Sequence, residues 1–221
     1  MVRIGIVMLQ GARHEHWEAI QHAALEMNVE VEIVELRKQS QLDSSIHGLI
    51  LPGGESTTMR IAGQSESLLD GIFDWITKHP ERPVLGTCAG AILLADPGKN
   101  RPPLIDLEVS RNAWGRQRCS FEAPVKVNLN TPEITHEAHF EIKRDKYNHK
   151  PLPMSNQAAE ISEQSFPGIF IRAPRFIEQS IRCEKIASLE QETVGIRQGS
   201  KLALTFHPEL TNDRRFHRWL I

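Results

Sequence analysis

The chain has 221 residues, a mass of 25.0 kDa, a formal net charge of −2 and a pI near 6.6. That length suits one sizeable α/β domain, and the balanced charge argues against a protein that binds nucleic acid by electrostatic attraction. The cysteines, Cys88, Cys119 and Cys183, are too widely spaced for a disulfide framework or a Cys-x-x-Cys metal site, which suits a reducing cytoplasm.

The first half of the chain alternates segments typical of strands and of helices. Its apolar N-terminus is far too short for a signal peptide or a membrane span and predicts a buried strand. Apolar residues at helical spacing predict helices, and alternating apolar and acidic residues predict a half-buried strand near a sheet edge. In chain order we predict a strand over 1–9, a helix over 14–27, the edge strand over 29–36, a strand over 46–51, a helix over 68–76, a strand over 82–85 and a helix from 91. This order predicts an α/β fold, a three-layer, mostly parallel sheet with helices on both faces.

The second half is less regular. We predict strands over 121–129, 169–171, 193–197 and 202–206, and a short terminal helix over 213–221. Residues from about 131 to 165 are polar and lack a regular period, so they predict a long surface excursion. The whole chain, 1–221, is expected to form a single domain.

The sequence Gly86-Thr87-Cys88-Ala89-Gly90 lies between a predicted strand and a predicted helix. A Gly-x-Cys-x-Gly turn in this place is the thiol version of a nucleophile elbow. Glycines suit it because side chains at 86 and 90 would collide with the adjoining strand and helix. The helix N-terminus would favour the thiolate of Cys88. By itself, the pentapeptide fits a buried structural cysteine beside a turn equally well.

His207-Pro208-Glu209 follows the last predicted strand and offers the thiol a base and an orienting group. Pro208 fixes the turn, so His207 and Glu209 can project from the same side of it. Glu209 would then hold the imidazole in one tautomer and stabilise its charged form. A His-Pro-Glu turn alone is more often a surface turn. Its place after a buried strand, in a chain with an elbow, favours catalysis.

Pro52-Gly53-Gly54-Glu55-Ser56 follows a predicted strand as the elbow does. Because the carboxyl ends of parallel strands meet at one edge of a sheet, the two motifs should lie together. The N–H groups of the glycine pair and of Ala89 would form an oxyanion hole, in which each donor contributes ~3 kcal/mol to lowering the barrier. The alternatives are an ordinary turn or a phosphate-binding loop, and no Gly-Lys-Ser/Thr follows to support the second.

Three motifs, in chain order Leu-Pro-Gly-Gly-Glu-Ser-Thr-Thr-Met-Arg, Gly-Thr-Cys-Ala-Gly and Phe-His-Pro-Glu-Leu, resemble the class I (triad) glutamine amidotransferases. Within that family the chain is similar to the glutaminase subunits of pyridoxal 5′-phosphate synthase. The likeness extends from Ile4 to about Arg215. Further family-like stretches are residues 9–12, 111–117, 120–123 and 170–174.

The resemblance implies that Cys88 attacks the side-chain amide of glutamine, forming a glutamyl thioester and releasing ammonia. His207 would move the proton and Glu209 would orient His207. A zwitterionic amino acid needs a cation for its carboxylate and an acceptor for its ammonium group. By motif, the resemblance assigns glutamine binding to Gly54, Glu55, Ser56, Arg111, Ile171 and Arg172, and the oxyanion hole to Gly54 and Ala89. It implies no cofactor and no metal.

The resemblance also implies a partner, a separate synthase subunit that receives the ammonia through a protected route. Docking on that subunit would activate the glutaminase, and twelve glutaminases would surround a core of twelve synthase subunits. No nucleic acid and no membrane surface is expected as a partner, and a cytoplasmic location is expected. The excursion over about 131–165 is longer than the link expected in this family.

Two other functions stay open. The chain could be a different thiol enzyme on the same fold, either a glutaminase for another pathway or an enzyme of the DJ-1/PfpI type. The latter type lacks a distant His-Pro-Glu, so Glu209 speaks against it. The chain could also be a non-catalytic regulatory subunit, but pure binding would not require Cys88, His207 and Glu209 together.

Two histidine-rich stretches invite a metal-site interpretation. In His14-Glu15-His16 the histidines are two apart, and on a helix such residues face different ways, so a solvated face is expected. His136-Glu137-Ala138-His139 lacks the His-Glu-x-x-His spacing, so surface residues are expected there too. Cys119 and Cys183 are expected to be structural thiols.

Overall fold

The computed structural model describes residues 1–64, 66–98, 101–111, 120–136 and 164–221. The helices are α1 (Arg13–Glu26), α2 (Ser56–Gln64), α3 (Leu68–Lys78), α4 (Ala89–Ala95) and α5 (Arg215–Leu220). The strands are β1 (Val2–Val7), β2 (Val31–Leu36), β3 (Gly48–Leu51), β4 (Val84–Thr87), β5 (Val109–Ser110), β6 (Ser120–Val127), β7 (Ser165–Ile171), β8 (Arg175–Phe176), β9 (Glu184–Leu189), β10 (Glu192–Gln198) and β11 (Lys201–Leu204). Within these residues the main sheet has the order β2-β1-β3-β4-β11-β10-β9-β6-β7.

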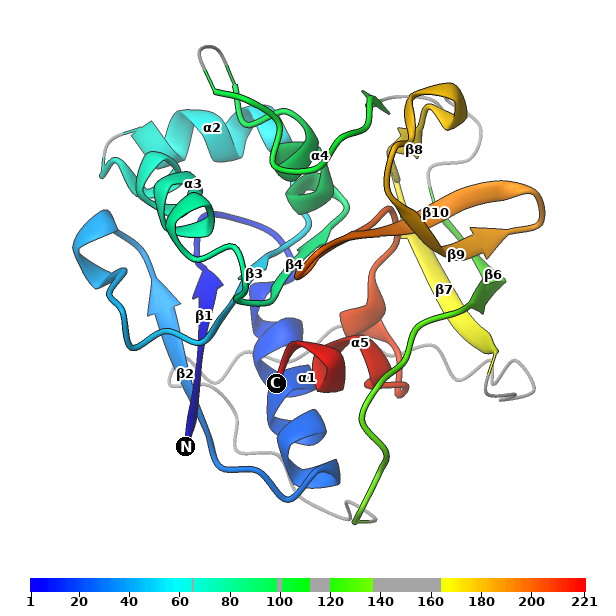
Figure 1. The fold of residues 1–221 in the computed structure, drawn as a ribbon, viewed down its shortest axis with the longest axis horizontal. Coiled ribbons are helices and arrows are strands. Elements are labelled where there is room, and N and C mark those ends of the chain that lie inside the picture. The colour runs from blue at the N-terminus through cyan, green and yellow to red at the C-terminus, as the bar shows by residue number, and fades with distance from the viewer. Residues whose placement is uncertain (65, 99–100, 112–119, 137–163) are drawn as a thin grey trace.

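The sheet has a parallel part and an antiparallel part (Figure 1). Strands β2, β1, β3, β4 and β11 pair in parallel, and β10, β9, β6 and β7 continue the sheet by antiparallel pairing. The predicted α/β class and the edge position of β2 are confirmed. The sheet is mixed rather than parallel throughout, because hairpins rather than helices connect the strands of the second half.

Two hydrophobic clusters cover the two faces of the sheet, as the three-layer prediction requires. Strand residues alternate between them: Leu49 and Leu51 belong to one cluster, and Ile50 belongs to the other. The first cluster packs under α2, α3 and α4, and the second packs under α1 and α5, which lie side by side (Figure 1). These strands therefore read as continuous apolar runs because both of their faces are buried.

Two elements of the main fold were not predicted. Helix α2 has the short, largely polar sequence STTMRIAGQ, in which Met59 and Ile61 are the only large apolar residues. Strand β9 begins with two exposed charged residues and buries only its middle. Helices α1, α3, α4 and α5 and strands β1, β3, β4, β6, β7, β10 and β11 all overlap their predicted ranges.

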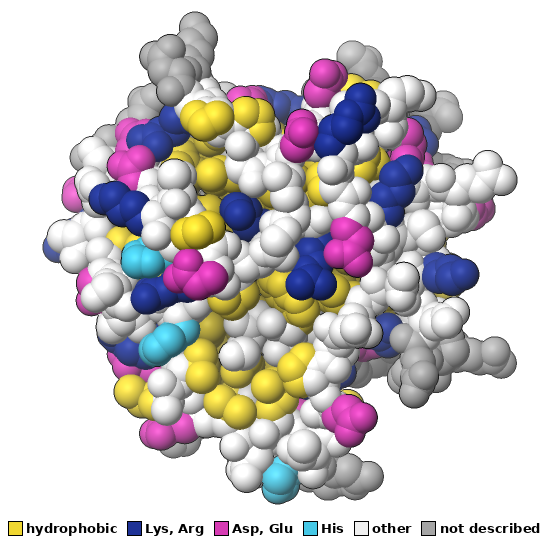
Figure 2. Space-filling view, viewed as in Figure 1, with side chains coloured by type: hydrophobic (Ala, Val, Ile, Leu, Met, Phe, Trp, Pro, Cys, Tyr) yellow, Lys and Arg dark blue, Asp and Glu magenta, His cyan; other side chains and the backbone are white. Residues whose placement is uncertain are grey.

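In the part of the chain that the structure describes, the face in Figure 2 shows no feature typical of a nucleic-acid interface, and the helices show none typical of a membrane span. Figure 2 shows basic and acidic side chains interspersed over one face of the molecule, with no broad basic region on that face. None of the helices in the described part of the chain combines the length and apolar character needed to cross a membrane. Most of the predicted excursion, residues 137–163, lies outside the described residues, as does Cys119.

Candidate active site

Cys88 occupies the sharp turn between β4 and α4. Its backbone has φ 49° and ψ −105°, a conformation that non-glycine residues rarely adopt, and its N–H donates to Leu204 O at 2.8 Å. A Cβ on Gly90 would lie 1.9 Å from Leu51 O, and one on Gly86 would lie 2.9 Å from the Gly90 carbonyl carbon. The predicted steric need for both glycines is therefore confirmed, and Cys88 lies on a strained elbow.

His207 reaches the elbow from the end of β11. Phe206 anchors this end of the strand, because its ring packs against Phe166 and Phe216 in the core. The His207 N–H donates to Ile169 O at 2.8 Å, which ties the turn to β7. The imidazole is thereby directed toward Cys88 from a rigid position.

Glu209 and Cys88 flank the His207 imidazole. Glu209 Oε1 lies 2.7 Å from His207 Nδ1, and the side chain of Cys88 lies close enough to the imidazole to act on its pKa. Burial lowers the pKa of His207, but the Glu209 carboxylate and Cys88 outweigh burial and raise it to about 10. The structure therefore brings the three residues together as a thiol, an imidazole held in its charged form and an orienting carboxylate.

The glycine-rich turn after β3 lies against these side chains. A Cβ on Gly53 would lie 2.4 Å from His207 Cε1 and 3.4 Å from Cys88 Cβ, so only glycine fits there. The prediction that the two turns meet at one sheet edge is confirmed. The Gln10 side chain fixes the turn from the other side, because its Oε1 accepts the Glu55 N–H at 3.0 Å.

The side chain of Glu55 is engaged in the turn itself. Its carboxylate accepts N–H bonds from Thr57 at 3.0 Å and from Thr58 at 2.7 Å, so it caps the start of α2. Hydrogen bonds from the Thr58 side chain and from both backbone N–H groups lower the pKa of Glu55 to about 2. Ser56, the first residue of α2, is buried. The predicted glutamine-binding loop is thus a rigid helix start beside Cys88.

The remaining predicted glutamine contacts divide into two groups. Ile171 O lies 3.9 Å from Cys88 Sγ, and Arg172 next to it has φ 43°, so the end of β7 borders the site in a strained conformation. Arg111 instead pairs with Asp96, Nη2 to Oδ2 at 2.7 Å, and Asp96 also pairs with Arg60. The structure brings Ile171 to the thiol and leaves Arg111 in an ion pair after α4.

His16 is a site residue that the sequence prediction missed. It was expected on a solvated face, but it is 0% exposed and its Nε2 lies 3.3 Å from Glu209 Oε2. The expectation was wrong because α5 covers this face of α1. A sequence signal existed: the buried residues of α1 recur with helical spacing and begin with His16, followed by Ala19, Ile20, Ala23 and Ala24.

The other candidate groups lie apart from the elbow. Cys183 is a half-buried thiol whose pKa is raised by burial, and it contacts Asp106 O at 3.5 Å. Among the described residues no group of three or more His, Cys, Asp or Glu side chains is arranged to hold a metal ion. His136 is exposed, and residues 137–139 of that motif lie outside the described residues.

Comparisons with known proteins match the chain over its whole length. The sequence profile of the SNO glutamine amidotransferase family matches residues 6–139 and 138–221. A curated relative from Thermococcus onnurineus, named pyridoxal 5′-phosphate synthase subunit PdxT, is 37% identical over 230 residues, which cover 100% of this chain and 98% of that protein. A relative of the same name from Pyrococcus furiosus is also 37% identical, with the same coverage.

Solved structures share the fold. A structure described as a glutamine amidotransferase superposes with a TM-score of 0.71 at 33% identity and covers 98% of this chain and 96% of its own. A glutamine amidotransferase from Thermotoga maritima, at 17% identity, has a TM-score of 0.55 and covers 99% of this chain and 80% of its own. The similarity therefore includes the parallel and the antiparallel parts of the sheet.

Proposed function

The chain belongs to the SNO glutamine amidotransferase family, and from this premise we propose that Cys88, His207 and Glu209 hydrolyse L-glutamine to glutamate and ammonia. It is the glutaminase subunit of a pyridoxal 5′-phosphate synthase and supplies that ammonia to a synthase subunit. The observation that carries the assignment of residues is the buried His207 imidazole, which is bonded to Glu209 and lies beside Cys88 at the Gly53 turn.

The reaction begins with attack of the Cys88 thiolate on the side-chain amide carbon of glutamine. The charged His207 donates its proton to the amide nitrogen as the C–N bond breaks, so ammonia leaves and a glutamyl thioester remains. Neutral His207 then takes a proton from water, and the hydroxide attacks the thioester carbon. Glutamate leaves and the thiolate with its imidazolium partner is restored.

Two backbone N–H groups stabilise the negative oxygen that forms at each attack. Ala89 is the first residue of α4, and the first N–H groups of a helix have no acceptor within it. Gly54, with φ 150°, adjoins Gly53 against Cys88 and supplies the second N–H. Both groups belong to rigid turns, so they need little reorganisation during the reaction, and each donor lowers the barrier by about 3 kcal/mol.

The substrate is held by the residues around the thiol. Gly54, Glu55 and Ser56 present backbone groups at the start of α2, and the carbonyl of Ile171 borders Cys88. Arg172 and Arg111 are the cations for the glutamine carboxylate. Arg111 must exchange its contact with Asp96 for the substrate to be bound in this way. Binding of glutamine is therefore coupled to an ion-pair exchange at the end of α4.

The ammonia acceptor is the synthase subunit, with one glutaminase bound to each synthase subunit of a twelve-subunit core. In water, ammonia takes up a proton and diffuses away. A docked partner that receives the neutral ammonia directly prevents this loss. This arrangement also explains why the glutaminase activity should rise on docking: hydrolysis without an acceptor wastes glutamine.

The test is glutamate release from glutamine by the chain alone and with a stoichiometric amount of the synthase subunit. We expect strong stimulation by the synthase, no release by Cys88→Ala, and unchanged release by Cys183→Ala, which removes a thiol away from the site. Glutamate release that the synthase does not stimulate would support the thiol chemistry and would indicate a different acceptor for the ammonia. Folded protein with no release under either condition would contradict the enzyme assignment.

A further inference from the structure

A buried chain of side chains continues the triad into the core between α1 and α5. His16 Nε2 lies 3.3 Å from Glu209 Oε2 and 3.1 Å from Thr87 Oγ1. On its other side, His16 Nδ1 lies 3.0 Å from His217 Nε2. His16, Glu209 and His217 have fully buried side chains. The order of contacts is therefore Cys88, His207, Glu209, His16 and His217, with Thr87 bonded to the fourth member.

The charge on Glu209 determines the tautomer of His16. Glu209 Oε2 is buried and has no hydrogen-bond partner among the described residues; His16 Nε2 lies 3.3 Å away as an ion-pair contact. A bare nitrogen lone pair 3.3 Å from a carboxylate oxygen would be repelled, so His16 carries its proton on Nε2, where the N–H is bonded to Thr87 Oγ1 and lies close to Glu209 without a hydrogen bond to it. His16 Nδ1 is then an acceptor, and only a His217 that is protonated on Nε2 can donate to it.

His217, at the far end of this row of side chains, is consistent with these positions of the protons. His217 Nδ1 is buried and has no hydrogen-bond partner in the described part of the chain, which is where the order leaves an unprotonated nitrogen. Burial, together with the positive charge of Arg214, lowers the pKa of both His16 and His217, to about 4 for His16. Although Glu209 favours a charged His16, burial outweighs it, so both rings are neutral at neutral pH.

We propose that His16 is a positioning residue of the proposed glutaminase: its Nε2 edge, held by Thr87 and His217, lies 3.3 Å from the second oxygen of Glu209 and stabilises the charge of that carboxylate electrostatically. Glu209 is thereby fixed in rotation and kept charged, so that its first oxygen remains on His207 Nδ1. His16 touches neither the substrate nor the reacting atoms, so it acts on the rate through Glu209 and His207. This inference rests on the proposed function.

The test compares His16→Leu, which removes the N–H, with His16→Gln, whose amide can place an N–H near Glu209 Oε2. His22→Leu is the control, a histidine on the same helix. We expect His16→Leu to lower kcat by about tenfold or more with KM within about twofold, because orientation is lost and binding is not. His16→Gln should recover most of the wild-type kcat, and His22→Leu should have the kcat and KM of the wild type.

A second measurement does not depend on glutamine as the substrate. The rate of Cys88 alkylation by iodoacetamide, followed on the Cys88 peptide by mass spectrometry, reports the thiolate fraction at each pH. In His16→Leu, a Glu209 that has lost the polar Nε2 edge beside it is less readily kept charged and stabilises the imidazolium less, so the rate at pH 6.5 should fall by about tenfold while the rate at pH 9 stays unchanged. His217→Leu should give a smaller shift in the same direction.

The outcomes separate this inference from the proposed function. Failure of the wild type to hydrolyse glutamine would contradict the function, and the alkylation profiles would still test His16. An unchanged profile in folded His16→Leu would overturn the positioning role, whatever its kcat. A His16→Gln variant as slow as His16→Leu would overturn it too. If His16→Leu does not fold, the His16→Gln and His217→Leu profiles decide.

Discussion

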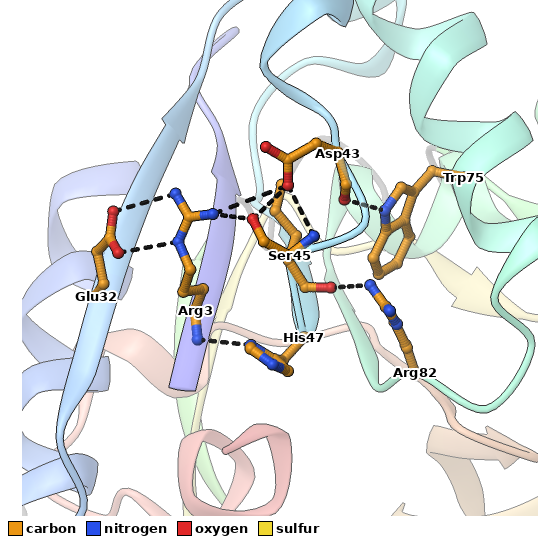
Figure 3. Close-up of polar contacts among 8 residues, drawn as sticks. Arg3, Glu32, Asp43, Ser45, His47, Trp75 and Arg82 are labelled. Atoms are coloured by element: carbon orange, nitrogen blue, oxygen red, sulfur yellow. Dashed lines mark hydrogen bonds and ion pairs between the residues drawn. The ribbon is translucent and has the colours of Figure 1, made fainter. Parts of the chain in front are cut away.

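The two ends of the parallel strands carry polar networks of opposite character. At the carboxyl ends, His16, His207 and Glu209 are buried together with the thiol. At the amino ends, Arg3 on β1 pairs with Glu32 on β2 and also contacts Ser45 and Asp43 in the loop before β3 (Figure 3). In this second network the side chains are 26% exposed for Arg3, 43% for Glu32 and 61% for Asp43.

The two networks differ in their exposure to solvent rather than in their number of contacts. In Figure 3 the amino-end contacts join separate elements, and Trp75 Nε1 and Arg82 add bonds to backbone carbonyls of the same loop. Water can replace the ion pairs of Arg3 with Glu32 and Asp43 at little cost. At the carboxyl end no water reaches Glu209 or His16, so each lost contact leaves a buried polar group without a partner. Equivalent substitutions at the two ends should therefore have very different effects.

The largest difference is expected between Glu209→Gln and Glu32→Gln, the same change made at opposite ends. Glu209→Gln removes the charge that holds the pKa of His207 high, so kcat should fall by about 10²- to 10³-fold. Glu32→Gln, on the exposed network, should leave kcat unchanged. The measurement is glutamate release in the presence of the synthase subunit. A Glu209→Gln enzyme within about twofold of the wild type would remove Glu209 from the proposed triad.

The same contrast holds for glycines. A Cβ on Gly90, at the carboxyl end, would lie 1.9 Å from Leu51 O, a backbone atom of the sheet that cannot move aside. A Cβ on Gly48, at the start of β3, would meet Ile4 Cδ1 at 3.1 Å and Pro83 O at 3.2 Å. Gly90→Ala should lower the free energy of unfolding by about 3 kcal/mol or prevent folding, and Gly48→Ala by about 1 kcal/mol.

Urea denaturation of both glycine variants gives the comparison. A Gly90→Ala protein as stable as the wild type would show that the elbow can relax and that the strain at Cys88 is not fixed by its neighbours. In that case the turn would also be expected to lose its hold on the thiol, and Cys88 alkylation would slow.

The elbow was predictable from sequence, and the support of the triad was not, for a physical reason. Gly86, Gly90 and the turn after β11 are local features whose steric needs appear within a few residues of Cys88 and His207. The burial of His16 depends on α5 and on the turn at Glu209, about 190 residues away in the sequence. The polar residues His14, Glu15 and Glu18 beside it favoured solvent, although the spacing of Ala19, Ile20, Ala23 and Ala24 marks the buried face.

The same distinction explains the remaining differences. The pairing of Arg111 with Asp96 joins two loops that no local pattern relates. Helix α2 has few apolar residues of its own and depends on the Glu55 cap and on packing against α3 and α4. The antiparallel pairing of β9 with β10 and β6 depends on the hairpins of the second half. In each case tertiary contacts override a weak local signal.

Acid should destabilise the carboxyl-end network selectively. In the unfolded chain His16 takes up a proton near its ordinary pKa of 6.5, whereas in the folded chain burial lowers that pKa to about 4. Below pH 6.5 the unfolded state therefore binds more protons, and stability is lost as the pH falls toward 4, by about 3 kcal/mol for His16. His217 adds a loss in the same direction.

Urea unfolding between pH 7 and pH 4.5 measures this loss. His16→Gln should flatten the pH dependence, because an amide does not take up a proton. His207 does not contribute in this range, because its pKa is raised to about 10 in the folded chain and both states are protonated below pH 6.5. It contributes instead from pH 6.5 upward, where its stabilisation is lost as the pH rises toward 10. Equal acid loss in His16→Gln and the wild type would contradict a buried neutral His16.

The smallest effect is expected from Arg3→Met, which removes the centre of the exposed network and keeps the apolar stem of the side chain. Arg3 lies 2.9 Å from Glu32 and 3.8 Å from Asp43, but both acids remain solvated when it is gone. We expect a fall in Tm of about 2 °C or less at low ionic strength, and a smaller one in 0.5 M NaCl, because salt screens exposed pairs and not buried ones. The control is His16→Leu, whose loss of Tm should be the same at both salt concentrations. A large, salt-independent fall for Arg3→Met would show that the amino-end network behaves as a buried one, and the contrast between the two ends of the sheet would then rest on chemistry rather than on solvent.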